Sequence, residues 1–268
     1  ISHTNIALFI ASKFAKHDCK IFLRESNNLF KSLNTKNFLY NFFFLKLVKI
    51  SYQNSILITP SKELSFSIKK KFRMKQKVFS INNPIMTKNL NLNLKKKFDF
   101  INIGSLTYQK DHFTLLEAFR IANLKKKNLK LIIIGEGNLK IKILEYISEY
   151  NLKKNVKVLS NKKNFTKYLN QSKIFILSSR YEGYPNVLID AAVAKLPIIT
   201  TNCEFGPSEI LQKYKYGKFF KVGDYIELSK LMLNNNGIKK LPEYLIKKNN
   251  LKKITKKYYE LFFKKNIK

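Results

Sequence analysis

The residues best suited to chemistry in this sequence are one lysine, Lys110, and two acidic residues, Glu182 and Asp190. Lys110 lies in a loop that opens with Gly104 and Ser105, where a glycine allows a tight backbone turn. A lysine in such a loop can place a positive charge beside a phosphate. The two carboxylates could accept hydrogen bonds from sugar and ribose hydroxyl groups. Because the residues around Asp190 are apolar, an unpaired carboxylate there would be unfavourable, which favours a ligand as its partner.

Two further segments contain glycine or proline at points where the backbone could contact a ligand. One is the pair Gly135 and Gly137, which directly follows an apolar run and is, taken singly, equally typical of a helix cap. The other segment consists of Gly183, Tyr184, Pro185, Asn186 and Val187. Proline suits the first turn of a helix, and the free N–H groups at a helix N-terminus can hold a diphosphate. Together the loops predict a site for a ligand with phosphate and hydroxyl groups.

Short apolar strands alternate with helical patterns from about Phe98 onward. The expected strands are Phe98–Ile103, Leu129–Ile134, Val156–Leu159, Ile174–Leu177 and Pro197–Thr200. The expected helices are Thr114–Leu124, Ile141–Tyr150 and Asn186–Ala194. This alternation is typical of βαβ units and of a parallel sheet covered by helices on both faces. Ligands bind at the carboxyl ends of such strands, so the loops described above should lie at one edge of the sheet.

The sequence divides into four parts by pattern and composition. Residues 1–85 contain α/β patterns that are too short for a complete doubly wound domain, and residues 86–97 are typical of a polar linker. Residues 98–247 contain the regular alternation. Residues 248–268 are expected to include a basic amphipathic helix, Leu251–Phe263, that packs against its own domains or rests on a membrane.

The net charge of +35 allows three interpretations: nucleic-acid binding, attraction to an anionic membrane, and compositional drift. The excess consists mainly of lysines spread along the whole chain. Arginine is the residue preferred for bidentate contacts with phosphates and bases. The charge pattern therefore favours drift together with a membrane surface, and it disfavours nucleic acid as a partner.

Cysteine usage and apolar runs indicate where the protein works. Cys19 and Cys203 lie far apart in the sequence and form no ligand-like pair, so neither a metal site nor a disulfide is expected, and a reducing compartment fits. The longest apolar run, Phe38 to Ile50, contains two lysines and is shorter than the roughly 18 to 20 residues of a membrane span. We expect a cytoplasmic protein that could associate peripherally with the inner face of the membrane.

Residues 182–211 carry a distinctive sequence, EGYPNVLIDAAVAKLPIITTNCEFGPSEIL. This segment resembles the signature of family-4 retaining glycosyltransferases, in which two acidic residues stand eight positions apart on a loop and a helix. The resemblance extends over INIGSLTYQKDHFTLLEAF, LIIIGEGN and YGKFFKVGD, roughly from Phe98 to Leu233. The first 85 residues resemble the second half of that family's N-terminal domain. The sequence KKITKKYYELF resembles the helix that crosses back to it.

The resemblance implies a GT-B fold. This is an α/β architecture with a C-terminal Rossmann-like domain, built on a parallel sheet, and a Rossmann-like N-terminal domain that is truncated here. It implies that Lys110 neutralises the donor diphosphate, Glu182 contacts the transferred sugar and Asp190 binds the ribose. The remaining donor-binding residues implied are Gly104, Ser105, Gly135, Gly137, Gly183, Tyr184, Pro185, Asn186 and Val187. No metal and no cofactor are expected, because the nucleotide sugar is itself a substrate.

The resemblance also implies a reaction and its partners. A hexosyltransferase of this kind would move a sugar from a nucleotide sugar, with a UDP-sugar as the expected donor, to a polysaccharide or lipid-linked acceptor in cell-envelope glycan synthesis, as for lipopolysaccharide. Asp190 stands where the family usually has glutamate, and Ser105 where many members have arginine. Three alternatives stay open: an inactive nucleotide-sugar-binding fragment, another GT-B enzyme such as a nucleotide-sugar epimerase, and a basic nucleic-acid-binding protein.

Overall fold

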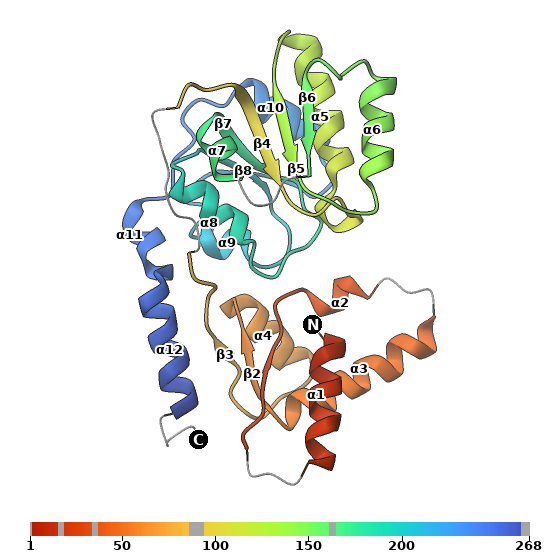
Figure 1. Ribbon diagram of the computed structural model, residues 1–268, viewed down its shortest axis with the longest axis vertical. Coiled ribbons are helices and arrows are strands. Elements are labelled where there is room, and N and C mark those ends of the chain that lie inside the picture. Colours follow the sequence, from red (N-terminus) through yellow and green to blue (C-terminus); the bar gives the residue numbers. More distant parts are fainter. Residues whose placement is uncertain (1, 16–18, 34–36, 86–93, 161–164, 264–268) are drawn as a thin grey trace. The chain divides into compact units, whose positions relative to one another are not determined.

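The chain folds into two compact units that are each built on a parallel sheet. The computed structural model describes residues 2–15, 19–33, 37–85, 94–160 and 165–263 (Figure 1). Unit 1 comprises Ile1–Pro84 and Lys252–Lys268, and unit 2 comprises Ile85–Leu251. The predicted α/β fold class with parallel sheets is confirmed. Residues 86–93 of the predicted linker lie outside the described residues.

Unit 2 contains a six-stranded sheet in which every described pairing is parallel. Its strands are β4 (Phe98–Ile103), β5 (Leu131–Ile134), β6 (Val156–Leu159), β7 (Ser172–Leu177), β8 (Ile198–Thr201) and β9 (Lys218–Phe220). They are arranged in the order β6-β5-β4-β7-β8-β9. The chain therefore leaves β4 toward β5 on one side and later returns to pair β7 on the other. This reversal beside β4 is a topological switch point, where open α/β sheets bind their ligands.

Helices cover both faces of this sheet. They are α5 (His112–Lys125), α6 (Lys140–Glu149), α7 (Phe165–Asn170), α8 (Asn186–Val193), α9 (Pro207–Ile210), α10 (Tyr225–Leu233) and α11 (Glu243–Ile246). Helices α5, α6 and α10 pack with Phe100 on one face, and α7, α8, α9 and α11 pack with Ile101 on the other. Since both faces are buried, the strands are apolar along nearly their whole length, as the sequence indicated.

Unit 1 contains a three-stranded parallel sheet in the order β1-β2-β3. Its strands are β1 (Phe22–Arg24), β2 (Ile56–Thr59) and β3 (Phe79–Ser80). Its helices are α1 (Ser2–Phe14), α2 (Leu29–Ser32), α3 (Phe38–Gln53), α4 (Lys62–Lys71) and α12 (Leu251–Phe263). Helix α12 places Ile254 and Leu261 against Ile58 of β2 and Ile81, which explains the apolar stripe of this otherwise lysine-rich helix. Among the described residues, no helix combines the length and the apolar character needed to cross a membrane.

Candidate functional site

Lys110 and Glu182, which are 72 positions apart in the sequence, meet at the switch point of unit 2. Lys110 Nζ lies 2.5 Å from Glu182 Oε1. The lysine side chain is 15% exposed and the glutamate side chain 6%, so the pair is largely shielded from water but still reachable by a ligand. An ammonium group held in such a shielded place interacts strongly with an incoming anion. The structure thus brings the two predicted catalytic residues together.

The loop after β4 is shaped to place Lys110. Tyr108–Lys110 form a short 3-10 helix, and Asp111 then takes up a left-handed conformation, with φ at 46°. Asp111 is the N-cap of α5, because its carboxylate accepts hydrogen bonds from the backbone N–H and the hydroxyl of Thr114. Gly104 leaves room for the lysine stem, since a Cβ built there would lie 3.3 Å from Lys110 Cδ. Ser105 is exposed on the same loop.

The loop after β7 is tied to the loop after β4 by three hydrogen bonds. Arg180 N donates to the Gln109 carbonyl at 2.8 Å, and Gln109 Nε2 donates to the Tyr181 carbonyl at 3.0 Å. Ser178 Oγ donates to the Lys110 carbonyl at 2.9 Å. Because these bonds join the flanks of Lys110 to the residues before Glu182, the two loops form one connected frame around the pair.

Arg180 is engaged within this frame. Its Nη2 lies 3.1 Å from Asp111 Oδ2, and its guanidinium stacks 4.5 Å from the centre of the Tyr108 ring. Asp111 is almost fully buried. A buried carboxylate without a partner destabilises the fold, so the ion pair with Arg180 also offsets the free-energy cost of burying Asp111. Arg180 therefore stabilises the loop, and Lys110 is the residue placed to supply charge to a ligand.

His112 contributes no positive charge to the site at neutral pH. It is fully buried at the start of α5. Burial, and then the neighbouring charge of Lys110, lower the pKa of His112 to about 4. The imidazole is consequently neutral at pH 7, which leaves Lys110 as the cation beside Glu182.

Two serines after β7 hold the pair in place. Ser178 bonds the backbone of Lys110, and Ser179 Oγ donates to Glu182 Oε1 at 2.7 Å. Thr201, the last residue of β8, donates from Oγ1 to the Ser179 carbonyl at 2.7 Å. These residues were not predicted from the sequence, and neither was the ion pair between Arg180 and Asp111. The available signal was that Ser178 and Ser179 directly follow a buried strand.

Gly135 and Gly137 lie where two loops approach each other closely. A Cβ at Gly135 would stand 1.8 Å from the Gly104 carbonyl oxygen, and one at Gly137 would stand 2.3 Å from the Leu106 carbonyl oxygen. Leu106 N donates to the Glu136 carbonyl across the same contact, at 2.8 Å. These glycines therefore allow the loop after β5 to pack against the loop after β4. Their contact with a donor stays a prediction.

The remaining predicted residues lie on the chain that leads into α8. Gly183, Pro185 and Tyr184 are buried, and the Tyr184 hydroxyl accepts a hydrogen bond from Asn249, so this side chain faces the core. Asn186 is exposed at the start of α8, where Val187 is half-buried. Asp190 is half-buried one turn further along α8. The hydroxyl of Tyr184 is thus occupied, and a phosphate contact by this residue would use its backbone.

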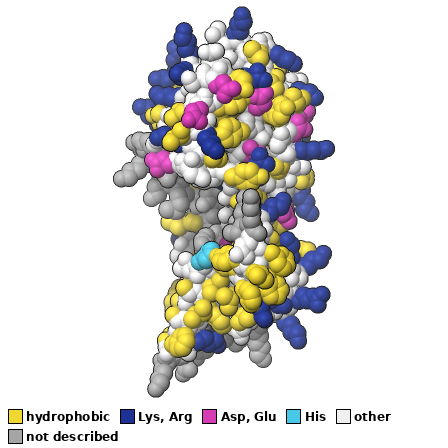
Figure 2. Space-filling model, turned by 90° about the vertical axis from the view of Figure 1, so that its right-hand side faces the viewer, with side chains coloured by type: hydrophobic (Ala, Val, Ile, Leu, Met, Phe, Trp, Pro, Cys, Tyr) yellow, Lys and Arg dark blue, Asp and Glu magenta, His cyan; other side chains and the backbone are white. Residues whose placement is uncertain are grey.

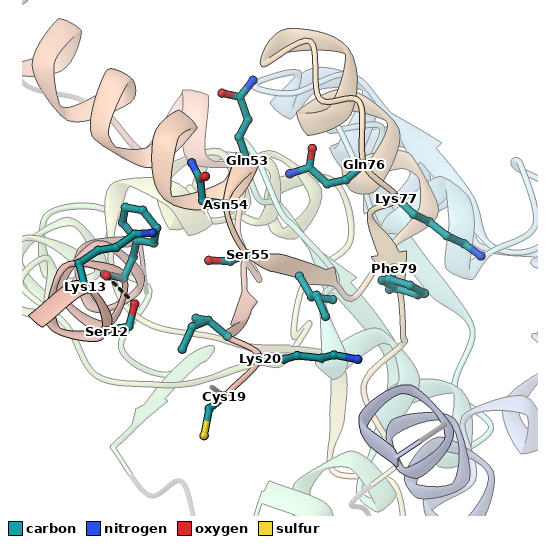
Figure 3. Close-up of a pocket in the computed structure, with 13 residues that line it drawn as sticks. Ser12, Lys13, Cys19, Lys20, Gln53, Asn54, Ser55, Gln76, Lys77 and Phe79 are labelled. Atoms are coloured by element: carbon teal, nitrogen blue, oxygen red, sulfur yellow. Dashed lines mark hydrogen bonds between the residues drawn. The ribbon is translucent and has the colours of Figure 1, made fainter. Parts of the chain in front are cut away.

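A separate cavity of about 620 Å³ lies in unit 1 (Figure 3). It opens at the amino ends of β1, β2 and β3, and its lining includes Lys13, Lys20 and Lys77 together with Ser55. Parallel sheets place their ligands at the opposite, carboxyl edge. The frame around Lys110 and Glu182 is therefore the stronger candidate site.

Among the described residues, no group of three or more His, Cys, Asp or Glu side chains is arranged to hold a metal ion.

Comparison with known families and structures gives a consistent result. The sequence model described as "Glycosyl transferases group 1" matches residues 86–252. An uncharacterised glycosyltransferase of Methanocaldococcus jannaschii is 41% identical over 152 residues, which is 54% of this chain and 37% of that protein. The amylovoran biosynthesis glycosyltransferase AmsD of Erwinia amylovora is 37% identical over 122 residues, 46% of this chain and 34% of that protein.

Among solved structures, a variant of S. aureus TarM in complex with fondaparinux, alpha-GlcNAc-glycerol and UDP superposes with a TM-score of 0.77. The sequences are 20% identical, and the match covers 96% of this chain and 54% of the TarM chain. At that identity the similarity establishes the fold alone, and the predicted GT-B-type architecture is confirmed. The chain spans about a third of the length of the two curated relatives and about half of the TarM chain.

Proposed function

The chain belongs to the group 1 glycosyltransferases, and from this premise we propose that unit 2 binds a UDP-sugar and serves its transfer to a glycan acceptor. The observation that carries the proposal is the shielded Lys110–Glu182 pair at the switch point of the unit 2 sheet. The acceptor we propose is a growing polysaccharide or a lipid-linked glycan. The name of the amylovoran relative supports this acceptor, and the UDP in the TarM structure supports the donor.

In the proposed reaction, the bond between the sugar C1 and the diphosphate oxygen breaks, and its electron pair leaves with the diphosphate. A bond forms between C1 and the acceptor oxygen on the same face, and the acceptor proton passes to the departing phosphate oxygen. Lys110 stabilises the charge that develops on the diphosphate, in a place where water is largely excluded. Glu182 accepts hydrogen bonds from the sugar hydroxyls and orients C1. No protein nucleophile and no metal take part.

Asp190 is proposed to bind the ribose hydroxyls. It is half-buried on α8, one turn beyond the segment proposed to contact phosphate. Asp190→Asn keeps the shape and removes the charge, so we expect the affinities for UMP and UDP to fall alike, by about tenfold, which is typical for a hydrogen bond to a charged group. Asp190→Glu should bind both nucleotides within about threefold of the wild type, because it retains the carboxylate. Isothermal calorimetry with both nucleotides measures these effects.

A surface residue of the same type controls the Asp190 experiment. Asp224 caps α10 through the backbone N–H of Glu227. Asp224→Asn should leave both affinities unchanged, because an amide oxygen can still cap the helix. If Asp190→Asn also binds UMP and UDP like the wild type, Asp190 is a helix-surface residue and its assigned role is wrong.

We further propose that the protein works in the cytoplasm, on the inner face of an anionic membrane. One face of unit 1 supports this, because large apolar side chains gather there (Figure 2). The exposed Phe, Leu and Ile side chains of α3, which we call the apolar face, are Phe38, Leu39, Phe42, Phe43, Leu47 and Ile50, and α1 adds the exposed Leu8, Ile10 and Phe14. Each of these side chains is at least 40% exposed. Helix α3 also carries Lys46 and Lys49 and no acidic residue, which suits anionic lipid.

Vesicle binding tests the membrane proposal. The protein should sediment with vesicles of phosphatidylglycerol, and much less with phosphatidylcholine, and should be released as salt rises. A Phe42→Ser, Phe43→Ser double variant should bind the anionic vesicles at least about tenfold more weakly, because two apolar rings no longer enter the bilayer. Leu124→Ser, at a 68% exposed position of α5, is the matched control. Concentration-dependent dimerisation without vesicle binding would instead assign the apolar face to a second copy of the chain.

A further inference from the structure

A buried hydroxyl shares the carboxylate oxygen that pairs with Lys110. Glu182 Oε1 accepts one hydrogen bond from Lys110 Nζ at 2.5 Å and another from Ser179 Oγ at 2.7 Å. Ser179 is fully buried and Glu182 is 5% exposed. Because water has little access to this buried residue, Oε1 depends on these two donors for its hydrogen bonds.

Ser179 is held by a contact that does not involve Lys110. Thr201 Oγ1, at the carboxyl end of β8, donates to the Ser179 carbonyl at 2.7 Å, and Thr201 is itself fully buried. Ser179 also lies only two residues beyond the last residue of β7. The backbone of Ser179 is therefore anchored to two neighbouring strands of the sheet, and the residue keeps its position when the Lys110 side chain moves.

A diphosphate that arrives at Lys110 competes with Glu182 for the ammonium group. As the Lys110 ammonium turns wholly or partly toward the phosphate, Glu182 Oε1 loses its charged hydrogen-bond donor. A buried carboxylate that loses every donor is strongly destabilised. We propose that Ser179 is a positioning residue, which keeps Glu182 hydrogen-bonded while the donor diphosphate draws Lys110 away. The inference rests on the proposed function, because it requires that Lys110 serve the diphosphate.

This role makes Ser179 matter only for ligands that recruit Lys110. In Ser179→Ala, Glu182 Oε1 would have no hydrogen-bond donor once the Lys110 ammonium turned away. Lys110 therefore stays paired with Glu182, and the diphosphate of the ligand is left without the positive charge of Lys110. We expect the affinity for UDP to fall by about tenfold, as for one hydrogen bond to a charged group. The affinity for UMP, which lacks the second phosphate, should stay within about twofold of the wild type. A residue with a merely structural role would affect both nucleotides alike.

The test is calorimetry with UDP and UMP on the wild type, Ser179→Ala and Ser179→Cys. Cysteine has a volume similar to that of serine, but its thiol is a weaker hydrogen-bond donor. We therefore expect Ser179→Cys to lose less UDP affinity than Ser179→Ala. Ser179→Cys also replaces Ser179→Ala in the test if the alanine variant folds poorly. Ser172→Ala is the matched control, because Ser172 is also fully buried on β7 and donates to the Tyr168 carbonyl, away from the site. Ser179→Ala is also combined with Lys110→Ala, which completes a double-mutant cycle.

The proposal predicts that Ser179→Ala lowers UDP affinity about tenfold in the wild-type background and not at all in the Lys110→Ala background. Equal losses for UDP and UMP, or the same loss in both backgrounds, would overturn it. If the wild type binds UDP but Ser179→Ala binds it equally well, the inference fails while the proposed function stands. If the wild type does not bind UDP, both fail together.

Discussion

Lys110→Ala should weaken UDP binding by about 10- to 150-fold and leave UMP binding within about threefold of the wild type. Charge-assisted hydrogen bonds to phosphate contribute about 1.5–3 kcal/mol, which corresponds to this range. The effect should reach the upper part of the range because the lysine side chain is only 15% exposed and its charge is poorly screened. His112 cannot replace the missing charge, because burial, the larger cause of its lowered pKa, remains in the variant. Calorimetry with the two nucleotides measures the difference.

Lys173→Ala is the matched control for this variant. Lys173 also pairs with a carboxylate, Asp99, at 2.8 Å, but its side chain is 58% exposed and lies toward the amino end of β7. Its removal should change neither affinity. Thermal unfolding of both variants shows whether unit 2 is intact, because Lys110→Ala also leaves Glu182 without its cation. If a folded Lys110→Ala binds UDP like the wild type, Lys110 does not serve the diphosphate.

Gly135→Ala should destabilise unit 2 by ~3 kcal/mol or more, toward the upper end of overpacking effects. The added Cβ would lie 1.8 Å from the Gly104 carbonyl oxygen, and a backbone atom cannot turn aside as the end of a side chain can. The loops after β4 and β5 would have to separate, which also displaces Lys110. Urea unfolding followed by circular dichroism gives the change in free energy, and UDP binding should be lost as well.

Gly104→Ala gives the matched comparison for Gly135→Ala. At Gly104 the new Cβ would meet only the stem of Lys110, with Cδ at 3.3 Å, and that stem is flexible. We expect a change in the free energy of unfolding below ~1 kcal/mol and a reduced affinity for UDP, because the lysine is pushed aside. If both alanine variants unfold at the same urea concentration as the wild type, the close packing of the two loops is incorrect.

The sequence was informative wherever a pattern was long and apolar. Strand β4 and helix α12 have the predicted bounds, since a strand pattern of six residues defines the first and a single apolar stripe defines the second. The short strand β6 also has the predicted bounds, although it contains an exposed lysine. Strand β9 and helix α10 were not predicted. Strand β9 has only three residues and begins with an exposed lysine, so its pattern is too short to recognise without the neighbouring β8 that pairs with it.

The candidate site was predictable by residue type but not by its internal contacts. Lys110 and Glu182 were selected because a cation and a carboxylate in loops after strands suit a phosphorylated sugar. Their direct pairing depends on β4 lying beside β7, which is a property of strand order rather than of local sequence. Ser179 was not predicted as a site residue for a related reason. A serine after a strand is ordinary until the structure places its hydroxyl 2.7 Å from Glu182 Oε1.

The central claim is that the carboxyl edge of the unit 2 sheet binds a nucleoside diphosphate through Lys110. Calorimetric titration of the wild-type chain with UDP, UMP, pyrophosphate and inorganic phosphate tests it most directly. The account predicts that UDP binds more tightly than UMP and pyrophosphate, because it alone offers both the ribose and the diphosphate, and that Lys110→Ala removes the preference for UDP over UMP. If UDP binds no better than inorganic phosphate, or if Lys110→Ala retains the preference, the proposed donor site is wrong.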